Sequence, residues 1–145
     1  MYSAASDYAK SVSKPLLVVG GPYGSSFGAQ IFPYKRHGCG DLCLDIDTIA
    51  CGGCPLEEGD VRSLPFNDKE FGASFCSHVI EHLPTVADAR KAISELERVA
   101  EKAFIITPSR LDPYAWLVPE HKLWVTPTAS GFSIVKRNKR AEVVT

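Results

Sequence analysis

Glycines and aspartates stand in this sequence where short apolar runs end, and their types and spacing suit a nucleotide-like ligand. The candidate contacts are Gly20, Gly21, Gly24, Asp45 and Asp60, together with Ile46 and Val61, which follow the two aspartates. Glycines let a backbone approach a ligand closely. An acidic residue about 20 residues after a glycine turn can accept hydrogen bonds from both hydroxyls of a ribose. Asp45 has that position relative to the glycines.

Histidines supply a second kind of chemistry. His78 follows Ser77 at the end of another apolar run, and His121 lies in an aromatic loop with Tyr114 and Trp116. Either histidine is a candidate general base, because imidazole titrates near neutral pH, although capping of backbone groups is its commoner role. Tyr114, Trp116 and His121 are candidates for an acceptor pocket. The alternative is that the loop only covers the edge of a sheet.

Five short apolar segments must position these residues. The predicted strands are Leu16–Val19, Asp41–Ile46, a very short strand ending at Val61, Ala73–His78 and Ala103–Thr107. Helices are predicted at Ser25–Phe32 and, from apolar residues at three- and four-residue steps, at Val86–Glu101. Alternating strands and helices predict a three-layer α/β domain with a mostly parallel sheet, whose strands end at a common ligand-binding edge.

The ends of the chain and one internal loop complete the predicted organisation. Residues 1–14 form an arm or short helix, Trp124–Thr126 and Phe132–Lys136 form an antiparallel hairpin, and residues 137–145 form a basic flexible tail. Thr48–Gly59, with its Cys-Gly-Gly-Cys-Pro run, excludes a long regular helix. The chain, residues 1–145, is therefore expected to be one domain, reduced in size.

The segment Gly59–Pro84, GDVRSLPFNDKEFGASFCSHVIEHLP, resembles the third and fourth strand region of class I (Rossmann-like) S-adenosylmethionine-dependent methyltransferases, in particular the type 11 methyltransferase domain. The resemblance extends more weakly over residues 16–108. It implies S-adenosylmethionine as cofactor and methyl transfer to a small-molecule acceptor. The implied contacts are Gly20, Gly21 and Gly24 under the cofactor, Asp45 on the ribose, Asp60–Val61 on the adenine, and Ser77–His78 near the reacting centre.

The glycine turn departs from the pattern of that family. The family usually has an acidic residue in the first strand and then Gly-x-Gly-x-Gly, where this sequence has Val18 and Pro22. An alternative therefore stays open, a non-catalytic S-adenosylmethionine-binding regulatory module or partner subunit. The turn also lacks the Gly-x-Gly-x-x-Gly fingerprint, so a nicotinamide dinucleotide is the poorer prediction.

Two motifs suggest zinc, and neither leads to a predicted metal site. His78-Val-Ile-Glu81-His82 spells the H-x-x-E-H of a zinc peptidase class, which requires the motif on a helix, whereas here it precedes Pro84 at a predicted turn. The second candidate is a zinc knuckle formed by Cys39, Cys43, Cys51 and Cys54. Four residues of a strand span about 13 Å, which keeps Cys39 and Cys43 apart, so free thiols are expected.

Composition narrows the class of protein. The 145 residues are 45% hydrophobic and 23% charged with a net charge of −1, which excludes fibrous and disordered classes and favours no polyanionic partner. The basic run Lys136–Arg140 lacks interleaved aromatic residues, so nucleic acid is not expected. No apolar run has the length of a membrane span, and cysteines without a signal peptide indicate the cytoplasm. A homodimer or a partner subunit stays open.

Overall fold

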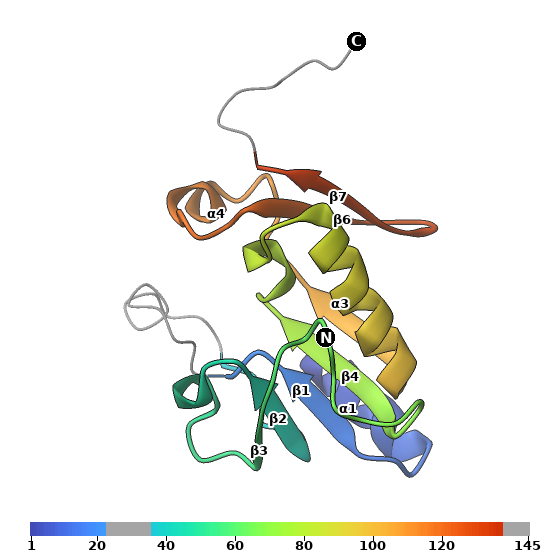
Figure 1. Cartoon of the computed structure of the whole chain (residues 1–145). Coiled ribbons are helices and arrows are strands. Elements are labelled where there is room, and N and C mark those ends of the chain that lie inside the picture. Colours follow the sequence, from blue (N-terminus) through green and yellow to red (C-terminus); the bar gives the residue numbers. More distant parts are fainter. Residues whose placement is uncertain (23–35, 138–145) are drawn as a thin grey trace.

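The computed structural model describes residues 1–22 and 36–137 (Figure 1). The candidate contact Gly24 and the predicted helix Ser25–Phe32 lie outside the described residues. The N-terminal segment is a helix, α1 (Tyr2–Ser11), rather than a loose arm. Ala5 and Ala9 lie four residues apart on one side of α1 and are buried, as expected for a helix that packs on a sheet.

Five strands form a parallel sheet in the order β3-β2-β1-β4-β5. They are β1 (Leu16–Val19), β2 (Leu42–Asp45), β3 (Leu56–Glu58), β4 (Phe71–Ser77) and β5 (Ala100–Ile106). All four residues of β1 are buried, because a central parallel strand is covered on both faces. The predicted α/β class with a mostly parallel sheet is confirmed.

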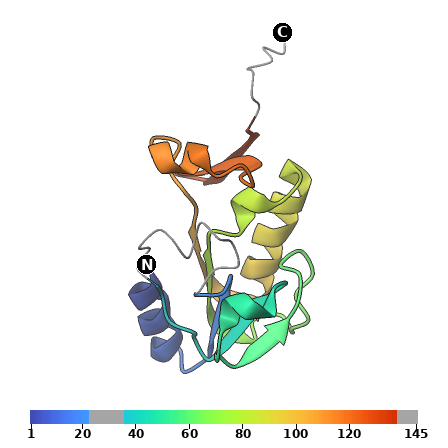
Figure 2. The same cartoon turned by 90° about the vertical axis from the view of Figure 1, so that its left-hand side faces the viewer.

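Helices cover both faces of this sheet and make three layers (Figure 2). Helix α3 (Val86–Val99) packs on one face through the buried stripe Ala89, Ala92, Leu96 and Val99. Helix α1 covers the other face, where its alanines meet Val18 and Phe75. The Thr85 side chain begins α3 by accepting a hydrogen bond from the Asp88 backbone N–H at 3.1 Å, as a threonine at a helix N-cap does.

The third strand is not where the sequence predicted it, because β3 ends at Glu58 and Val61 lies in the turn that follows. All three residues of β3 are exposed, so this edge strand carries no apolar pattern that could reveal it. Backbone pairing with β2 defines it, with Leu56 opposite Cys43 and Glu58 opposite Asp45. The prediction of no long helix over Thr48–Gly59 is confirmed, since the only helical element in this range is the 3-10 turn η1 (Thr48–Cys51), which precedes β3.

The C-terminal hairpin is confirmed and forms a sheet of its own, β6 (Leu123–Thr128) with β7 (Gly131–Lys136). Together with helix α4 (Pro113–Leu117) it lies beyond the carboxyl ends of β4 and β5 (Figure 1). The Lys122 N–H donates to the Glu81 carbonyl at 2.8 Å, and β6 packs against the 3-10 turn η2 (Ile80–His82). The hairpin is thereby attached to the end of β4.

The expected free thiols at Cys39 and Cys54 are a wrong prediction, because these two residues form a disulfide. The chain brings their Cα atoms to 5.4 Å across 15 residues, a proximity that sequence spacing does not reveal. The other three cysteines, Cys43, Cys51 and Cys76, are free and buried.

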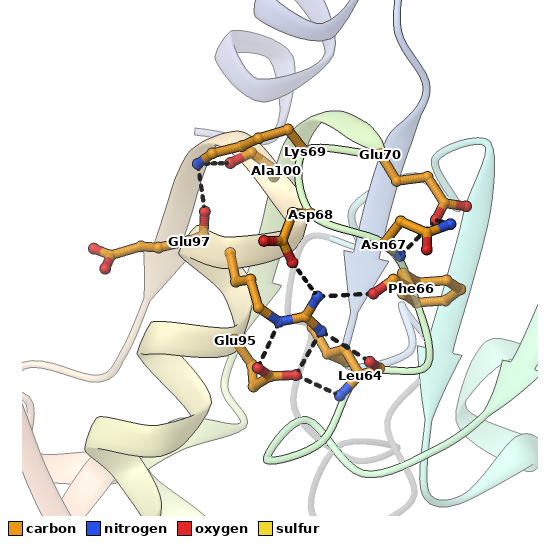
Figure 3. Close-up of polar contacts among 10 residues, drawn as sticks. Leu64, Phe66, Asn67, Asp68, Lys69, Glu70, Glu95, Glu97 and Ala100 are labelled. Carbon is orange, nitrogen blue, oxygen red and sulfur yellow. Dashed lines mark hydrogen bonds and ion pairs between the residues drawn. The ribbon is translucent and has the colours of Figure 1, made fainter.

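Arg98 of helix α3 ties the loop between β3 and β4 to this helix; Figure 3 labels its partners Leu64, Phe66 and Glu95. Its guanidinium donates to the carbonyls of Leu64 and Phe66 at 3.0 and 2.8 Å. It also forms a two-bond ion pair with Glu95, at 2.7 and 2.8 Å. Glu95 in turn accepts a hydrogen bond from the Leu64 backbone N–H at 2.8 Å. This network fixes the loop that follows Asp60 along the chain.

Among the residues described, no helix combines the length and the apolar character that a membrane crossing requires.

Candidate functional site

The turn after β1 lies directly against the ends of its two neighbouring strands. Gly20 has φ of +90°, and its N–H donates to the Leu44 carbonyl of β2 at 3.0 Å. A Cβ on Gly20 would come within 2.5 Å of the Val79 Cγ2 and 2.8 Å of the Ser77 carbonyl oxygen. Only glycine satisfies both conditions. The turn is thus held between the carboxyl ends of β2 and β4.

Asp45 joins this turn to the end of β2. One carboxylate oxygen accepts from the Gly21 backbone N–H at 2.8 Å, and the other accepts from the Asp47 backbone N–H at 2.9 Å. A Cβ on Gly21 would meet the Ala50 carbonyl of η1 at 2.1 Å. The sequence-predicted pair of a glycine turn and an acidic strand end is therefore in direct contact.

Asp60 lies at the same edge of the sheet, because the N–H of its neighbour Gly59 donates to the Asp45 carbonyl at 3.1 Å. The Asp60 carboxylate accepts two bonds from the Arg62 Nε, both at 3.0 Å. The hydrogen bond from Arg62 is the main cause that lowers the pKa of Asp60, so this carboxylate is charged at neutral pH. Val61 is buried and Ile46 is exposed. We call Gly20, Gly21, Asp45 and Asp60 the glycine-turn side.

Ser77 and His78 continue this edge at the end of β4. His78 has φ of +55°, and its N–H donates to the Ile106 carbonyl at 3.0 Å. Its Nδ1 lies 3.2 Å from Oε1 of Glu81, and this hydrogen bond is the main cause that raises the pKa of His78. A raised pKa increases the protonated fraction near neutral pH, which disfavours the predicted role of His78 as a base.

The predicted acceptor-pocket residues divide into two places. Trp116 packs on Trp124 of the hairpin with ring centroids 4.6 Å apart, and the Arg137 guanidinium lies 5.5 Å from each ring. Arg137 also donates to the Trp116 and Val118 carbonyls, so it is not part of a loose tail. Tyr114 is 58% exposed. Trp116 thus packs against another part of the protein, as in the alternative prediction that the aromatic loop only covers a sheet. The sheet that it covers is the hairpin and not the edge of the main sheet.

His121 instead faces the turn after β4. It is buried, and its ring lies edge-on to that of His82, with centroids 4.9 Å apart. One ligand atom from each of Glu81, His82 and His121 lies within 4.8 Å of the others. This group was not predicted from the sequence, although both of its parts carry a signal, the Glu81-His82 half of the H-x-x-E-H motif and the histidine in the aromatic loop. We call Glu81, His82, His121 and Trp116 the hairpin side.

A separate hollow of about 530 Å³ lies at the opposite edge of the sheet, between α1 and the start of β1. Its lining includes Tyr2, Lys10, Pro15 and Asp41, none of which the sequence analysis singled out as a ligand contact. Ligands of open parallel sheets bind beyond the carboxyl ends of the strands, so this hollow is the poorer candidate.

The adenosine half of S-adenosylmethionine suits the glycine-turn side, which offers a close backbone approach and a carboxylate at the end of β2. The methionine half has less support, since Val18, at the position where the family usually carries an acidic residue, is fully buried against α1. Strand β1 has the sequence Leu-Leu-Val-Val and therefore contains no carboxylate.

The fold is that of the Rossmann-like methyltransferase class. The profile of the "Methyltransferase domain" family matches residues 23–105, more than half of the chain. The protein therefore belongs to this family of S-adenosylmethionine-dependent methyltransferases. The matched range contains Asp45, Asp60 and Glu81 but neither Gly20 nor His121.

Individual relatives agree with this assignment. A protein of Encephalitozoon cuniculi (strain GB-M1) that carries a methyltransferase name is 41% identical over 61 residues, which cover 41% of this chain and 29% of that protein. The chain thus matches less than a third of that relative.

Two solved structures are similar in fold. The trans-methyltransferase CalH, in complex with SAH, has a TM-score of 0.53 and 14% identity over 82% of this chain and 40% of its own. The PH0226 protein of Pyrococcus horikoshii OT3 has a TM-score of 0.49 and 18% identity over 88% of this chain and 66% of its own. The similarity to CalH bears on the fold alone.

Proposed function

We propose that this protein binds S-adenosylmethionine at the glycine-turn side and transfers its methyl group to a small-molecule acceptor. The observation that carries the proposal is the contact between Asp45 and the turn. The Asp45 carboxylate accepts a hydrogen bond from the Gly21 N–H at 2.8 Å, while its own carbonyl accepts one from Gly59 at 3.1 Å. The ends of three strands therefore meet at one place, and we assign the adenosine to it.

Each residue has a distinct task in this proposal. The Gly20–Gly21 backbone forms the floor under the ligand, Asp45 accepts hydrogen bonds from the ribose hydroxyls, and the Asp60–Val61 turn lies beside the adenine. When bound, S-adenosylmethionine supplies an electrophilic methyl group on a sulfonium. The protein contributes chiefly by holding the acceptor in line with that methyl group, since orientation can supply about 7–11 kcal/mol of a barrier.

Titration calorimetry with S-adenosylhomocysteine tests the proposal. Asp45→Ala should weaken binding about 10–100-fold, because hydrogen bonds to a charged group contribute about 1.5–3 kcal/mol. Asp41→Ala is the matched control, since Asp41 precedes the amino end of the same strand and accepts from the Leu16 N–H at 2.8 Å. Absence of binding to the wild-type protein would refute the proposal, and equal losses in the two folded variants would refute the assignment of Asp45.

A second candidate function is a non-catalytic S-adenosylmethionine-binding module or partner subunit. Val18 favours it, because this buried valine supplies no charge where the family usually holds the methionine end of the cofactor. Calorimetric binding of S-adenosylhomocysteine, together with no transfer of labelled methyl from S-adenosylmethionine to a pool of metabolites, would support this candidate over the enzyme.

A further inference from the structure

We propose that Glu81, His82 and His121 form a binding site for a divalent transition-metal ion of the zinc class. The three side chains come from two segments, η2 and the turn before β6, and one ligand atom of each lies within 4.8 Å of the others. This inference goes beyond the proposed function and does not depend on it, because metal binding can be measured without cofactor or acceptor.

Glu81 provides the first argument. Its side chain is 1% exposed, and its Oε1 is paired with the Nδ1 of His78 at 3.2 Å. Within the described part of the chain, Oε2 of Glu81 is buried without any hydrogen-bond partner. A buried carboxylate oxygen without a partner is costly, and a cation among the three side chains would remove that cost.

His121 provides the second argument. Its Nδ1 lies 3.0 Å from the Ala115 carbonyl oxygen. A carbonyl can only accept, so Nδ1 carries the proton and the lone pair of the neutral ring is on Nε2. Metal-binding histidines almost always have this arrangement, in which a carbonyl or carboxylate orients the ring through its other nitrogen.

A backbone hydrogen bond holds the two segments together before any ion binds, from the Lys122 N–H to the Glu81 carbonyl at 2.8 Å. Within the η2 turn, the His82 N–H donates to the Val79 carbonyl at 3.1 Å. Ligand atoms around a tetrahedral zinc ion are about 3.3–3.5 Å apart, given bonds of about 2.0–2.2 Å. Small side-chain rotations from the present spacing complete such a site.

The donor set indicates the class of ion. Imidazole nitrogens suit Zn²⁺, Fe²⁺ and Co²⁺, whereas Mg²⁺ and Ca²⁺ prefer oxygen ligands. Two histidines and one glutamate also leave coordination positions open. This site differs from the zinc-peptidase site of the H-x-x-E-H motif. His78 pairs with Glu81, and the second histidine of the site is His121, 39 positions beyond His82 in the sequence.

Titration with Co²⁺, followed by its visible absorption, tests the site in the full chain. We expect saturable binding with ligand-field bands and no thiolate charge-transfer band, competition by Zn²⁺, and no competition by Mg²⁺. Changes to residues that only orient a metal ligand weaken metal binding about 10–100-fold. Removal of a direct ligand should have a larger effect, so we expect a greater loss of affinity in His82→Ala and in Glu81→Gln. His37→Ala, which alters a histidine packed on Tyr2 and Phe75, should keep the wild-type affinity.

Three results would overturn the proposal. They are no saturable binding by the wild-type protein, a thiolate charge-transfer band that assigns the ion to cysteines, or unchanged affinity in the folded His82→Ala variant. His82 is only partly buried, so this variant decides the question even if Glu81→Gln fails to fold. Zn²⁺ should also raise the melting temperature of the wild-type protein but not that of His82→Ala.

Discussion

The glycine-turn side and the hairpin side lie at the same edge of the sheet and are built in different ways. On the glycine-turn side, each group lies within two residues of a strand end, and short hydrogen bonds such as that from Gly21 to Asp45 at 2.8 Å join the strands directly. On the hairpin side, the chain must dock a separate two-stranded sheet and α4 before His121 can meet His82.

The family match does not separate the two sides. It covers residues 23–105, which include Asp45 and Asp60 but also Glu81 and His82, and it leaves out Gly20 and Gly21. Helix α4, His121 and the hairpin follow residue 105, so this part of the hairpin side lies outside the matched range.

The largest effect should come from the glycine turn itself. Gly20→Ala should lower the free energy of unfolding by about 3 kcal/mol, from the strained φ and from the overlap with Val79 and Ser77. Gly53→Ala is the matched control, because Gly53 has φ of +86° but no atom of the described residues lies within 4 Å of the added Cβ. That variant should lose only about 1 kcal/mol. Urea unfolding measures both, and equal losses would mean that the turn is not packed as described.

A smaller effect should be confined to the hairpin side. Trp116→Ala removes the ring that packs on Trp124 and under the Arg137 guanidinium and should cost about 1 kcal/mol of stability. Affinity for S-adenosylhomocysteine should stay at the wild-type value, since the described side-chain contacts of Trp116 are with Trp124, Arg137 and Arg110. Tyr114→Ala, on the same helix and more exposed, is the control for stability. A large loss of affinity in Trp116→Ala would break the division between the two sides.

The smallest effect concerns pH and the network around Arg98 (Figure 3). The hydrogen-bonded ion pair with Arg98 lowers the pKa of Glu95. The pair therefore stabilises the folded protein fully above the ordinary glutamate pKa, and this stabilisation is lost as pH falls through the lowered pKa. Because Glu95 is partly exposed, the contribution should stay below about 1 kcal/mol.

Unfolding free energies measured at neutral and at acidic pH test this contribution. The decrease on acidification should be smaller in Glu95→Gln than in the wild-type protein. The exposed neighbour Glu97→Gln should keep the wild-type decrease. Identical decreases in the wild-type protein and in Glu95→Gln would exclude the ion pair as a source of acid sensitivity.

Most elements of the fold were predictable because their signals are local. The buried run Leu16–Val19, the periodic helix Val86–Val99 and the hairpin each carry a pattern that short-range packing explains. Strand β3 was misplaced because Leu56–Glu58 is exposed and is held by backbone pairing alone. The Cys39–Cys54 disulfide was missed for a related reason, since the fold and not the spacing brings the two residues together.

The candidate site likewise has one part that could be predicted from the sequence and one part that could not. The contact between Asp45 and Gly21 could be expected, because both follow strands that must end at one edge. The meeting of Glu81 and His82 with His121 could not, because it depends on the docking of a hairpin whose position no local pattern encodes. Trp116 was equally ambiguous until its contact with Trp124 was known.

Hydrogen exchange with and without S-adenosylhomocysteine tests the central claim most directly. We predict slower exchange in peptides that contain Gly20–Gly21, Asp45–Asp47 and Gly59–Val61, with little change in α1 and at the start of β1. Protection around Tyr2, Lys10 and Asp41, which line the hollow at the opposite edge, or no protection at all, would contradict the assignment of the cofactor to the carboxyl ends of the strands.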